Sequence, residues 1–262
     1  MSIMSGKGNI ARINDLEIYY ELTNPNLLSE GKSLLILLHE GLGSTGQWKD
    51  FPDTLANALD LPVLVYDRLG YGKSSQVETR TADYLNYEAE CILPMLLKHL
   101  NYTGNIIPFG HSDGATVALL YAAIYPGKTE KVIAEAPHVI IEDQTVAGVK
   151  QAIKAYSEGE LKKRLEKYHG KQCDQMFWGW ANFWTKESSR SWNMTSLLQR
   201  IESPVLYIQG DKDDFGTLKQ GEEISIRVMG DYEDLILENC GHIPHFEAKE
   251  EVLSAVMKFI RE

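Results

Sequence analysis

The chain has 262 residues, of which 44% are hydrophobic and 24% are charged. This composition is typical of a soluble folded protein that needs neither disulfides nor a structural metal to build its core. Lys and Arg number 26 against 37 Asp and Glu, which gives a formal net charge of −11. So acidic a chain lacks the electrostatic footprint of a protein that binds nucleic acid or an anionic membrane, and we expect neither as a partner.

The cysteines Cys91, Cys173 and Cys240 form no CxxC motif and no cluster of metal ligands. Their odd number argues against a complete disulfide framework, and reduced thiols predict a cytoplasmic protein. Residues 1–10 lack the apolar segment of a secretory signal, and no apolar run approaches the ~20 residues of a membrane span. No motif predicts a metal or a cofactor.

The N-terminal half alternates apolar runs with helical patterns. The run 34–38 is continuously apolar, as expected of a strand that is buried on both faces. Pro94 is expected to kink the helix that it interrupts. In chain order we predict strands at 18–22 and 34–38, a helix at 50–59, a strand at 63–66, a helix marked by Tyr84, Tyr87, Cys91 and Met95, a strand at 105–110 and a helix at 114–125.

The alternation is interrupted once and then resumes. Residues 138–200 contain four of the five tryptophans and no convincing strand, which predicts a helical insertion within a core formed by residues 1–137 and 201–262. Strand–helix alternation predicts an α/β fold, with a mostly parallel sheet covered by helices on both faces. The further elements are strands at 131–136, 205–208 and 235–237, a helix at 217–228 and a last helix marked by Val252, Val256, Phe259 and Ile260.

Residues 110–114 form a G-x-S-x-G motif between a predicted strand and a predicted helix, which is the context that this motif requires. Such a strained turn lifts the Ser112 hydroxyl clear of the sheet, while the two glycines let strand and helix approach closely. The backbone N–H of Asp113 then lies at a helix start, where it can bind a developing oxyanion. Ser112 is therefore the candidate nucleophile; the alternative is a glycine-rich turn with an incidental serine.

Two further glycine-containing loops follow predicted strands. In the loop 39–44, the backbone N–H of Gly41 is the candidate second donor to the oxyanion, although a plain strand-to-helix turn is the alternative. The loop 67–74 carries a weaker functional signal, and we expect a mainly architectural role.

Two loops near the C-terminus supply a carboxylate and a histidine. Asp213 follows the strand at 205–208, and His242 follows the strand at 235–237, with His245 as its competitor. A histidine that removes the serine proton makes the hydroxyl a competent nucleophile, and a buried carboxylate fixes the tautomer of that histidine. Because Ser112, Asp213 and His242 all follow predicted parallel strands, we expect them to meet at one edge of the sheet.

With these residues in this order, the chain resembles the α/β-hydrolase superfamily. The resemblance covers nearly the whole chain and rests on residues 39–44, 67–74, 110–114, 210–213 and 241–242. It implies that Ser112 is the nucleophile, Asp213 the acid and His242 the base. It also implies that the N–H groups of Gly41 and Asp113 form the oxyanion hole, and that residues 138–200 form a cap over the active site.

The chain departs from this pattern at Glu40, where members of the superfamily often have glycine. The carboxylate either crowds the oxyanion hole or turns away and braces the loop; we favour bracing, and we list Glu40 as a candidate substrate contact. At Asp113 we expect only the backbone to act. If both carboxylates faced the pocket, they would disfavour anionic substrates.

The aromatic tract 168–184 suggests a partly apolar substrate. Most of its rings are expected to pack the cap onto the core, and Trp178 and Trp184 are candidates for the pocket wall. His138, at the mouth of the cap, is a candidate substrate contact, and a structural role is the alternative. The basic run 162–164 is expected to be a solvated helix face.

Fold alone does not determine function. We predict a carboxylesterase that acts on a small, partly apolar ester through an acyl-enzyme on Ser112. A thioesterase, a lactonase, an amidase, a hydrolase of carbon–carbon bonds, a lyase or a non-catalytic ligand-binding protein are the alternatives. The carbon–carbon hydrolase would need a cationic pocket, which the sequence does not reveal. By the resemblance, a serine nucleophile argues against haloalkane dehalogenases and epoxide hydrolases, which use aspartate. No heptads predict a coiled-coil assembly.

Overall fold

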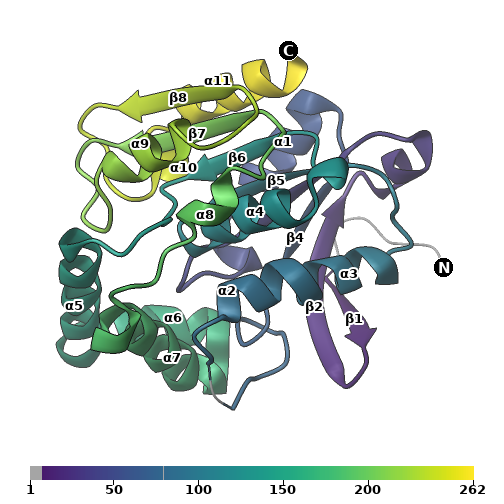
Figure 1. Cartoon of the computed structure of the whole chain (residues 1–262). Helices are drawn as coiled ribbons and strands as arrows, with labels where there is room; N and C mark the ends of the chain where they lie inside the picture. The colour runs from purple at the N-terminus through teal and green to yellow at the C-terminus, as the bar shows by residue number, and fades with distance from the viewer. Residues whose placement is uncertain (1–7, 79) are drawn as a thin grey trace.

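A computed structural model describes residues 8–78 and 80–262, so the expectation for residues 1–10 falls mostly outside it. An eight-stranded sheet forms the centre, in the order β1-β2-β4-β3-β5-β6-β7-β8 (Figure 1). Strand β2 is antiparallel to both its neighbours, and all other adjacent pairs are parallel. The strands are β1 Asn9–Ile13, β2 Leu16–Thr23, β3 Leu34–Leu38, β4 Val63–Tyr66, β5 Ile106–His111, β6 Val132–Glu135, β7 Val205–Gly210 and β8 Tyr232–Leu237.

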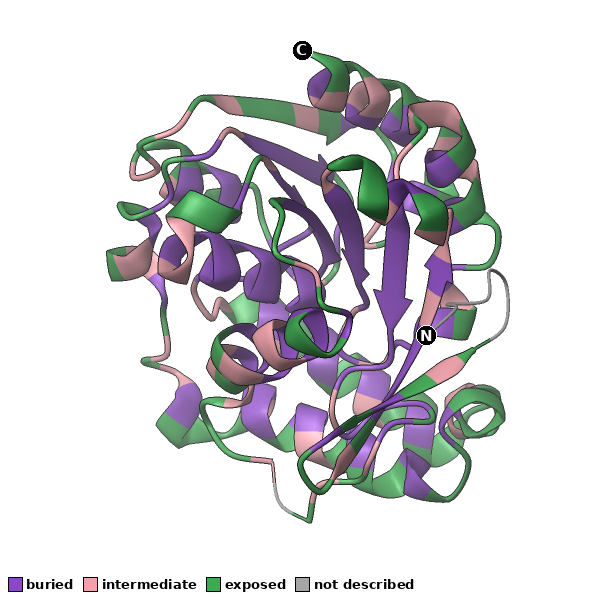
Figure 2. Cartoon of the chain, turned by 90° about the vertical axis from the view of Figure 1, so that its right-hand side faces the viewer, coloured by how far each residue is buried: buried purple, intermediate pink, exposed green. Residues whose placement is uncertain are grey.

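Helices cover both faces of this sheet, as predicted. Alternate side chains of β3 enter two separate cores. Leu34, Ile36 and Leu38 pack in a core with α3 (Leu93–His99) and α4 (Asp113–Ile124). Leu35 and Leu37 pack in a core with α1 (Phe51–Leu59) and α11 (Lys249–Arg261). A strand between two helical layers is therefore apolar at every position. Figure 2 shows the buried strands enclosed by helices whose outward faces are exposed.

The helices agree with the sequence pattern, with small shifts at their ends. The helices predicted at 50–59, 114–125 and 217–228 are observed with ends within three residues of those bounds, whereas the helices between 138 and 200 were predicted only as a group. The helices are α1 Phe51–Leu59, α2 Tyr84–Tyr87, α3 Leu93–His99, α4 Asp113–Ile124, α5 Asp143–Glu158, α6 Leu161–His169, α7 Cys173–Thr185, α8 Thr195–Leu198, α9 Lys219–Ser225, α10 Pro244–Glu247 and α11 Lys249–Arg261. None of those in the described ranges is long and apolar enough to cross a membrane.

Pro94 divides the helix that the sequence predicts around it. A π-helical turn, Glu88–Ile92, separates α2 from α3, and Pro94 lies in the first turn of α3. Proline has no N–H to donate and fits the first turn of a helix, where no intrahelical acceptor is required. The expected kink is thus a change of helix type just before the proline.

The insertion between β6 and β7 contains α5, α6 and α7, which lie together at one side of the sheet (Figure 1). Its two ends run side by side: Ile140 and Asn193 form an antiparallel bridge, and the Met194 N–H donates to the Val139 carbonyl at 2.9 Å. Apart from that bridge, residues 138–200 contain no strand. We call the segment from α5 to α7 the cap.

Candidate active site

Ser112 lies in a sharp turn between β5 and α4, with φ 53° and ψ −118°. The two flanking glycines make this turn possible. A Cβ atom at Gly110 would lie 2.0 Å from the Gly114 carbonyl oxygen, and one at Gly114 would lie 1.9 Å from the Leu38 carbonyl oxygen. The Ser112 N–H donates to the Glu135 carbonyl at 2.8 Å, which ties the strained turn to β6. The sequence motif is therefore a steric requirement of this turn.

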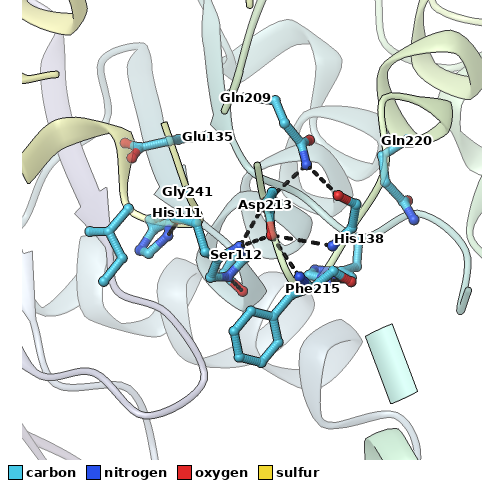
Figure 3. Close-up of polar contacts among 12 residues, drawn as sticks. His111, Ser112, Glu135, His138, Gln209, Asp213, Phe215, Gln220 and Gly241 are labelled. Carbon is cyan, nitrogen blue, oxygen red and sulfur yellow. Dashed lines mark hydrogen bonds and ion pairs between the residues drawn. The ribbon is translucent and has the colours of Figure 1, made fainter. Parts of the chain in front are cut away.

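The structure brings Ser112, His242 and Asp213 together. The Nε2 atom of His242 is 3.0 Å from the Ser112 Oγ, and its Nδ1 is 2.8 and 2.9 Å from the two Asp213 carboxylate oxygens. Asp213 also accepts the Phe215 N–H at 2.7 Å and the Gln209 side-chain amide at 2.9 Å, and Figure 3 shows these contacts converging on it. With Nδ1–H donated to Asp213, Nε2 is free to accept the serine proton.

The electrostatics of the pair suit a general base. Burial, the largest single influence, would lower the pKa of His242, but the charge and hydrogen bond of Asp213, together with the charges of Glu40 and Glu135, outweigh it, and the pKa is raised. Burial would raise the pKa of Asp213, but the charge of His242 and the hydrogen bonds that it accepts lower it instead. Asp213 is therefore ionised at neutral pH, and it stabilises the imidazolium that forms when His242 takes a proton.

The loops that carry the acid and the base follow neighbouring parallel strands, β7 and β8. They approach each other so closely that a Cβ atom at Gly210 would lie 2.2 Å from the Cys240 carbonyl oxygen. The competing histidine lies elsewhere. Its N–H and Nδ1 contact one carboxylate oxygen of Glu135, at 2.9 and 2.8 Å, and the His245 side chain is almost fully buried.

Gly41 and Asp113, whose backbone N–H groups are the candidate oxyanion donors, both line the cavity that contains Ser112. Neither N–H has a protein acceptor within the described ranges. Asp113 is the first residue of α4, so its N–H has no intrahelical acceptor. The arrangement provides two backbone donors for an oxyanion.

The Asp113 side chain turns away from the cavity mouth into a buried network. One carboxylate oxygen accepts the Tyr84 hydroxyl at 2.6 Å and Arg68 Nη2 at 3.4 Å, and the other accepts Trp184 Nε1 at 3.2 Å. The Arg68 side chain is only 1% exposed and also donates to the Glu40 carbonyl at 3.0 Å. The Asp113 charge is thus compensated within this buried network.

Glu40 braces its loop, the alternative favoured from the sequence, and it is also part of the cavity wall. Its carboxylate accepts the Leu42 N–H and, at 3.4 Å, the Gln47 side-chain amide, so it braces the loop 39–44. It also lines the cavity. Burial raises the pKa of Glu40, although the hydrogen bond from Leu42 opposes that shift.

The cavity above Ser112 has a volume of about 530 Å³ and a mostly apolar wall. Trp184 lies in this wall, as predicted, and so does Trp180, which the sequence did not single out. Trp178 was wrongly predicted to line it: its side chain is 38% exposed and lies outside the wall. On a helix, residues 178 and 180 point about 200° apart, whereas 180 and 184 share a face. The apolar wall consists of Leu42, Val149, Leu161, Leu165, Tyr168, Trp180, Trp184, Phe215, Ile243 and Phe246.

Comparison with known proteins agrees with this geometry. The family model described as "Alpha/beta hydrolase family" matches residues 35–255. The chain belongs to the α/β hydrolase family.

The curated relatives of this α/β hydrolase include a proline iminopeptidase and a serine hydrolase. Proline iminopeptidase of Lactobacillus acidophilus is 24% identical over 87% of this chain and 90% of that protein. Serine hydrolase BPHL of Homo sapiens is 28% identical over 77% of this chain and 68% of that protein. Among solved structures, 2-hydroxy-6-oxo-6-phenylhexa-2,4-dienoate hydrolase from a Rhodococcus species superposes with a TM-score of 0.78 at 18% identity, covering 98% of this chain and 99% of that one. The structural match shows the shared fold.

His138 of this α/β hydrolase both lines the cavity and supports the acid loop. Its Nε2 donates to the Phe215 carbonyl at 3.1 Å, and its backbone N–H donates to the Thr116 hydroxyl at 3.1 Å. Its ring packs against Trp184, with centroids 5.0 Å apart. Burial lowers the pKa of His138, so the ring is neutral and acts as a wall and a support.

The cap is fastened to the two glycine loops by side chains that the sequence did not reveal. His169 Nε2 donates to the Leu42 carbonyl at 3.0 Å, while its Nδ1 accepts the Gly72 N–H at 2.9 Å. Gln172 donates to the Gly72 carbonyl at 2.6 Å. A single histidine in a helical pattern gave no signal of this role. The loop 67–74 is architectural, as expected, because it anchors the cap. No three His, Cys, Asp or Glu side chains in residues 8–78 and 80–262 are placed to hold a metal ion.

Proposed function

We propose that this α/β hydrolase is a carboxylesterase that forms an acyl-enzyme on Ser112. The observation that supports this most strongly is the continuous contact from Ser112 Oγ to His242 Nε2, at 3.0 Å, and from His242 Nδ1 to Asp213, at 2.8 Å. A serine joined in this way to a histidine and a buried carboxylate is an activated nucleophile.

The proposed reaction has two halves. His242 Nε2 takes the Ser112 proton while Oγ attacks the ester carbonyl. The oxyanion that forms accepts hydrogen bonds from the N–H groups of Gly41 and Asp113. The carbonyl reforms, the bond to the alkoxy oxygen breaks, and His242 gives its proton to the departing alcohol. Water then attacks the acyl group while His242 takes one water proton; return of that proton to Ser112 releases the carboxylic acid. Asp213 stays ionised and holds the imidazolium.

The cavity suggests the kind of acyl group. Its volume of about 530 Å³ is in the usual range for small-molecule sites, and its wall includes Trp180, Trp184 and Phe215. Aromatic and aliphatic walls favour a small, partly apolar ester. We further propose a reducing, cytoplasmic compartment, which the free thiols of Cys91, Cys173 and Cys240 support.

A peptidase is a second candidate, favoured by Glu40. A carboxylate in the cavity wall near Ser112 offers an acceptor for the N–H groups of a substrate amine. Curated relatives are named proline iminopeptidases. Turnover of proline 4-nitroanilide would favour this candidate, whereas turnover of 4-nitrophenyl acetate alone would favour the esterase.

The first experiment is labelling with a fluorophosphonate, followed by intact mass and peptide mapping. We expect one adduct per chain on Ser112, and none in Ser112→Ala or His242→Ala. The labelled protein should also lose 4-nitrophenyl acetate hydrolysis in proportion to the adduct. An unlabelled, folded wild-type protein, or undiminished ester turnover in Ser112→Ala, would refute the proposal.

A further inference from the structure

The mouth of the active-site cavity carries three positive side chains, Lys49, Arg164 and Lys167, which we call the cationic rim. All three residues are exposed, whereas Ser112 is buried. Lys49 belongs to the core, and the other two belong to α6 of the cap, so positive charge lies on both sides of the opening. No member of the rim forms an ion pair with a carboxylate in the described part of the chain.

Two other basic residues of α6, Lys162 and Lys163, do not belong to the cationic rim. Lys162 pairs with Asp174 at 2.8 Å and Lys163 pairs with Glu160 at 3.5 Å, and neither lines the cavity. Arg164 follows Leu161 by three residues and therefore shares its cavity-facing side. The basic run 162–164 is thus not one solvated face: two of its charges are neutralised outside the cavity, and the third borders it.

Lys49 is held in place on the core side. Its backbone has φ 53°, in the left-handed region that few residues other than glycine and asparagine adopt. Its Nζ lies 4.6 Å from the ring centroid of Phe246, which also lines the cavity. The chain as a whole has a formal net charge of −11, so the local positive charge at this opening is opposite in sign to the net charge. Such an opening concentrates anions locally.

The negative groups of the cavity lie at its other end. The Asp113 carboxylate is engaged by Arg68 and Tyr84, which removes the repulsion of anions expected if it faced the pocket. Glu40 lies on the loop 39–44 and is tied to the Leu42 N–H. The cavity thus has a carboxylate beside the nucleophile, an apolar middle and a positive mouth, and this polarity imposes one direction on a charged substrate.

We propose that this enzyme prefers esters that carry a carboxylate at the end remote from the scissile bond, with that carboxylate bound at the cationic rim. The inference rests on the proposed esterase function. The ester carbonyl lies at Ser112, the apolar chain crosses the aromatic wall, and the carboxylate emerges between α6 and Lys49. The charge of the substrate, and not only its length, then determines specificity.

The test compares 4-nitrophenyl monoesters of adipate and suberate, whose carboxylates are too remote to attack their own ester, with analogues that end in a carboxamide, which has the same shape but no charge. We expect wild-type kcat/KM to favour the carboxylate, most strongly at the chain length that reaches the rim. Because one exposed charge pair contributes about 1.4- to 5-fold, Arg164→Gln/Lys167→Gln, which removes two, should lower this preference by about 2- to 25-fold. Lys162→Gln/Lys163→Gln, which removes the same charge from the outer side of α6, should leave the preference unchanged.

Failure of this inference and failure of the esterase proposal give different results. Ester turnover with no preference for the carboxylate, or an equal loss in the control double variant, would overturn the role of the rim and leave the esterase intact. If no ester is turned over, calorimetry with 8-amino-8-oxooctanoate and the neutral octanediamide still tests the rim. Tighter binding of the anion, lost in Arg164→Gln/Lys167→Gln alone, would support it, and equal binding of the two compounds would refute it.

Discussion

Replacing Asp213 by asparagine tests the proposed catalytic relay because it removes one charge without changing the side-chain shape. Asp213 is surrounded by donors only: His242 Nδ1–H, the Phe215 and Gly216 N–H groups, and the Gln209 side-chain amide. A carboxylate accepts all four, whereas an amide has one acceptor oxygen and one NH2 group. In any rotamer, the asparagine NH2 faces at least one of these donors.

The size of the effect follows from this conflict. An imidazole without its carboxylate loses control of its tautomer and loses the charge that stabilises its protonated form, which costs about 10³–10⁴ in kcat. This range corresponds to about 4–5.5 kcal/mol of transition-state stabilisation. A buried donor left unsatisfied costs about 1–3 kcal/mol of folding stability.

The pH profile provides an independent check. The active form of His242 is neutral, so kcat/KM rises with pH through the pKa of this residue. Burial would lower that pKa, but Asp213 raises it above its ordinary value of 6.5. In Asp213→Asn, burial is opposed only by weaker contributions, so the acid limb of the residual activity should move to lower pH.

The assay is hydrolysis of 4-nitrophenyl acetate between pH 4.5 and 9, together with urea unfolding. Asp211→Asn is the matched control, because Asp211 lies on the same loop, is partly exposed and forms its ion pair with Lys212 instead of with His242. The control should keep the activity and the profile of the wild type. If Asp213→Asn retained kcat within tenfold of wild type, or if its acid limb moved to higher pH, the assigned role of Asp213 would be wrong.

Three further predictions concern the turn, the cavity wall and the buried acid. Gly114→Ala places a Cβ atom 1.9 Å from a β3 carbonyl oxygen, so its urea midpoint should fall sharply; an unchanged midpoint would contradict the steric basis of the turn. Trp180→Ala should change KM and the preference among acyl chains by at least about fivefold, whereas Trp178→Ala, outside the cavity wall, should change neither; equal effects would disprove the assignment. Burial would raise the pKa of Glu135, but His245 lowers it below the ordinary value of 4.5. Glu135 therefore stabilises the fold at pH values above the pKa of the unfolded chain, and this stabilisation is lost as the pH falls through the lower pKa of the folded protein. The loss of stability with falling pH, followed by urea unfolding, should therefore be shallower in Glu135→Gln; an unchanged slope would show that Glu135 contributes none of it.

Several features were readable from the sequence because their causes are local. The boundaries of β3 and β4 agree with the predicted 34–38 and 63–66, since a strand enclosed by helices is apolar along its whole length. The turn around Ser112 is recognisable from Gly110 and Gly114, because a Cβ atom at either position would collide with the backbone. The order of Ser112, Asp213 and His242 after parallel strands already places them at one edge of the sheet. The hairpin strand β1 was missed, because it lies at an edge and is only half-buried.

Only the tertiary structure determined which way side chains face and what they contact. Trp178 and Trp180 are equivalent in the sequence, but the packing of the cap on the core places Trp180 in the cavity wall and Trp178 outside it. In the same way, Arg164 borders the cavity, whereas Lys162 pairs with Asp174 outside it. His245 is as well placed in sequence as His242, but β6 offers it a buried Glu135. The candidate catalytic residues could thus be recognised from local sequence, by the glycines around Ser112 and by the places of Asp213 and His242 after strands. Their surroundings depend on contacts between segments far apart in the chain, which no local pattern records.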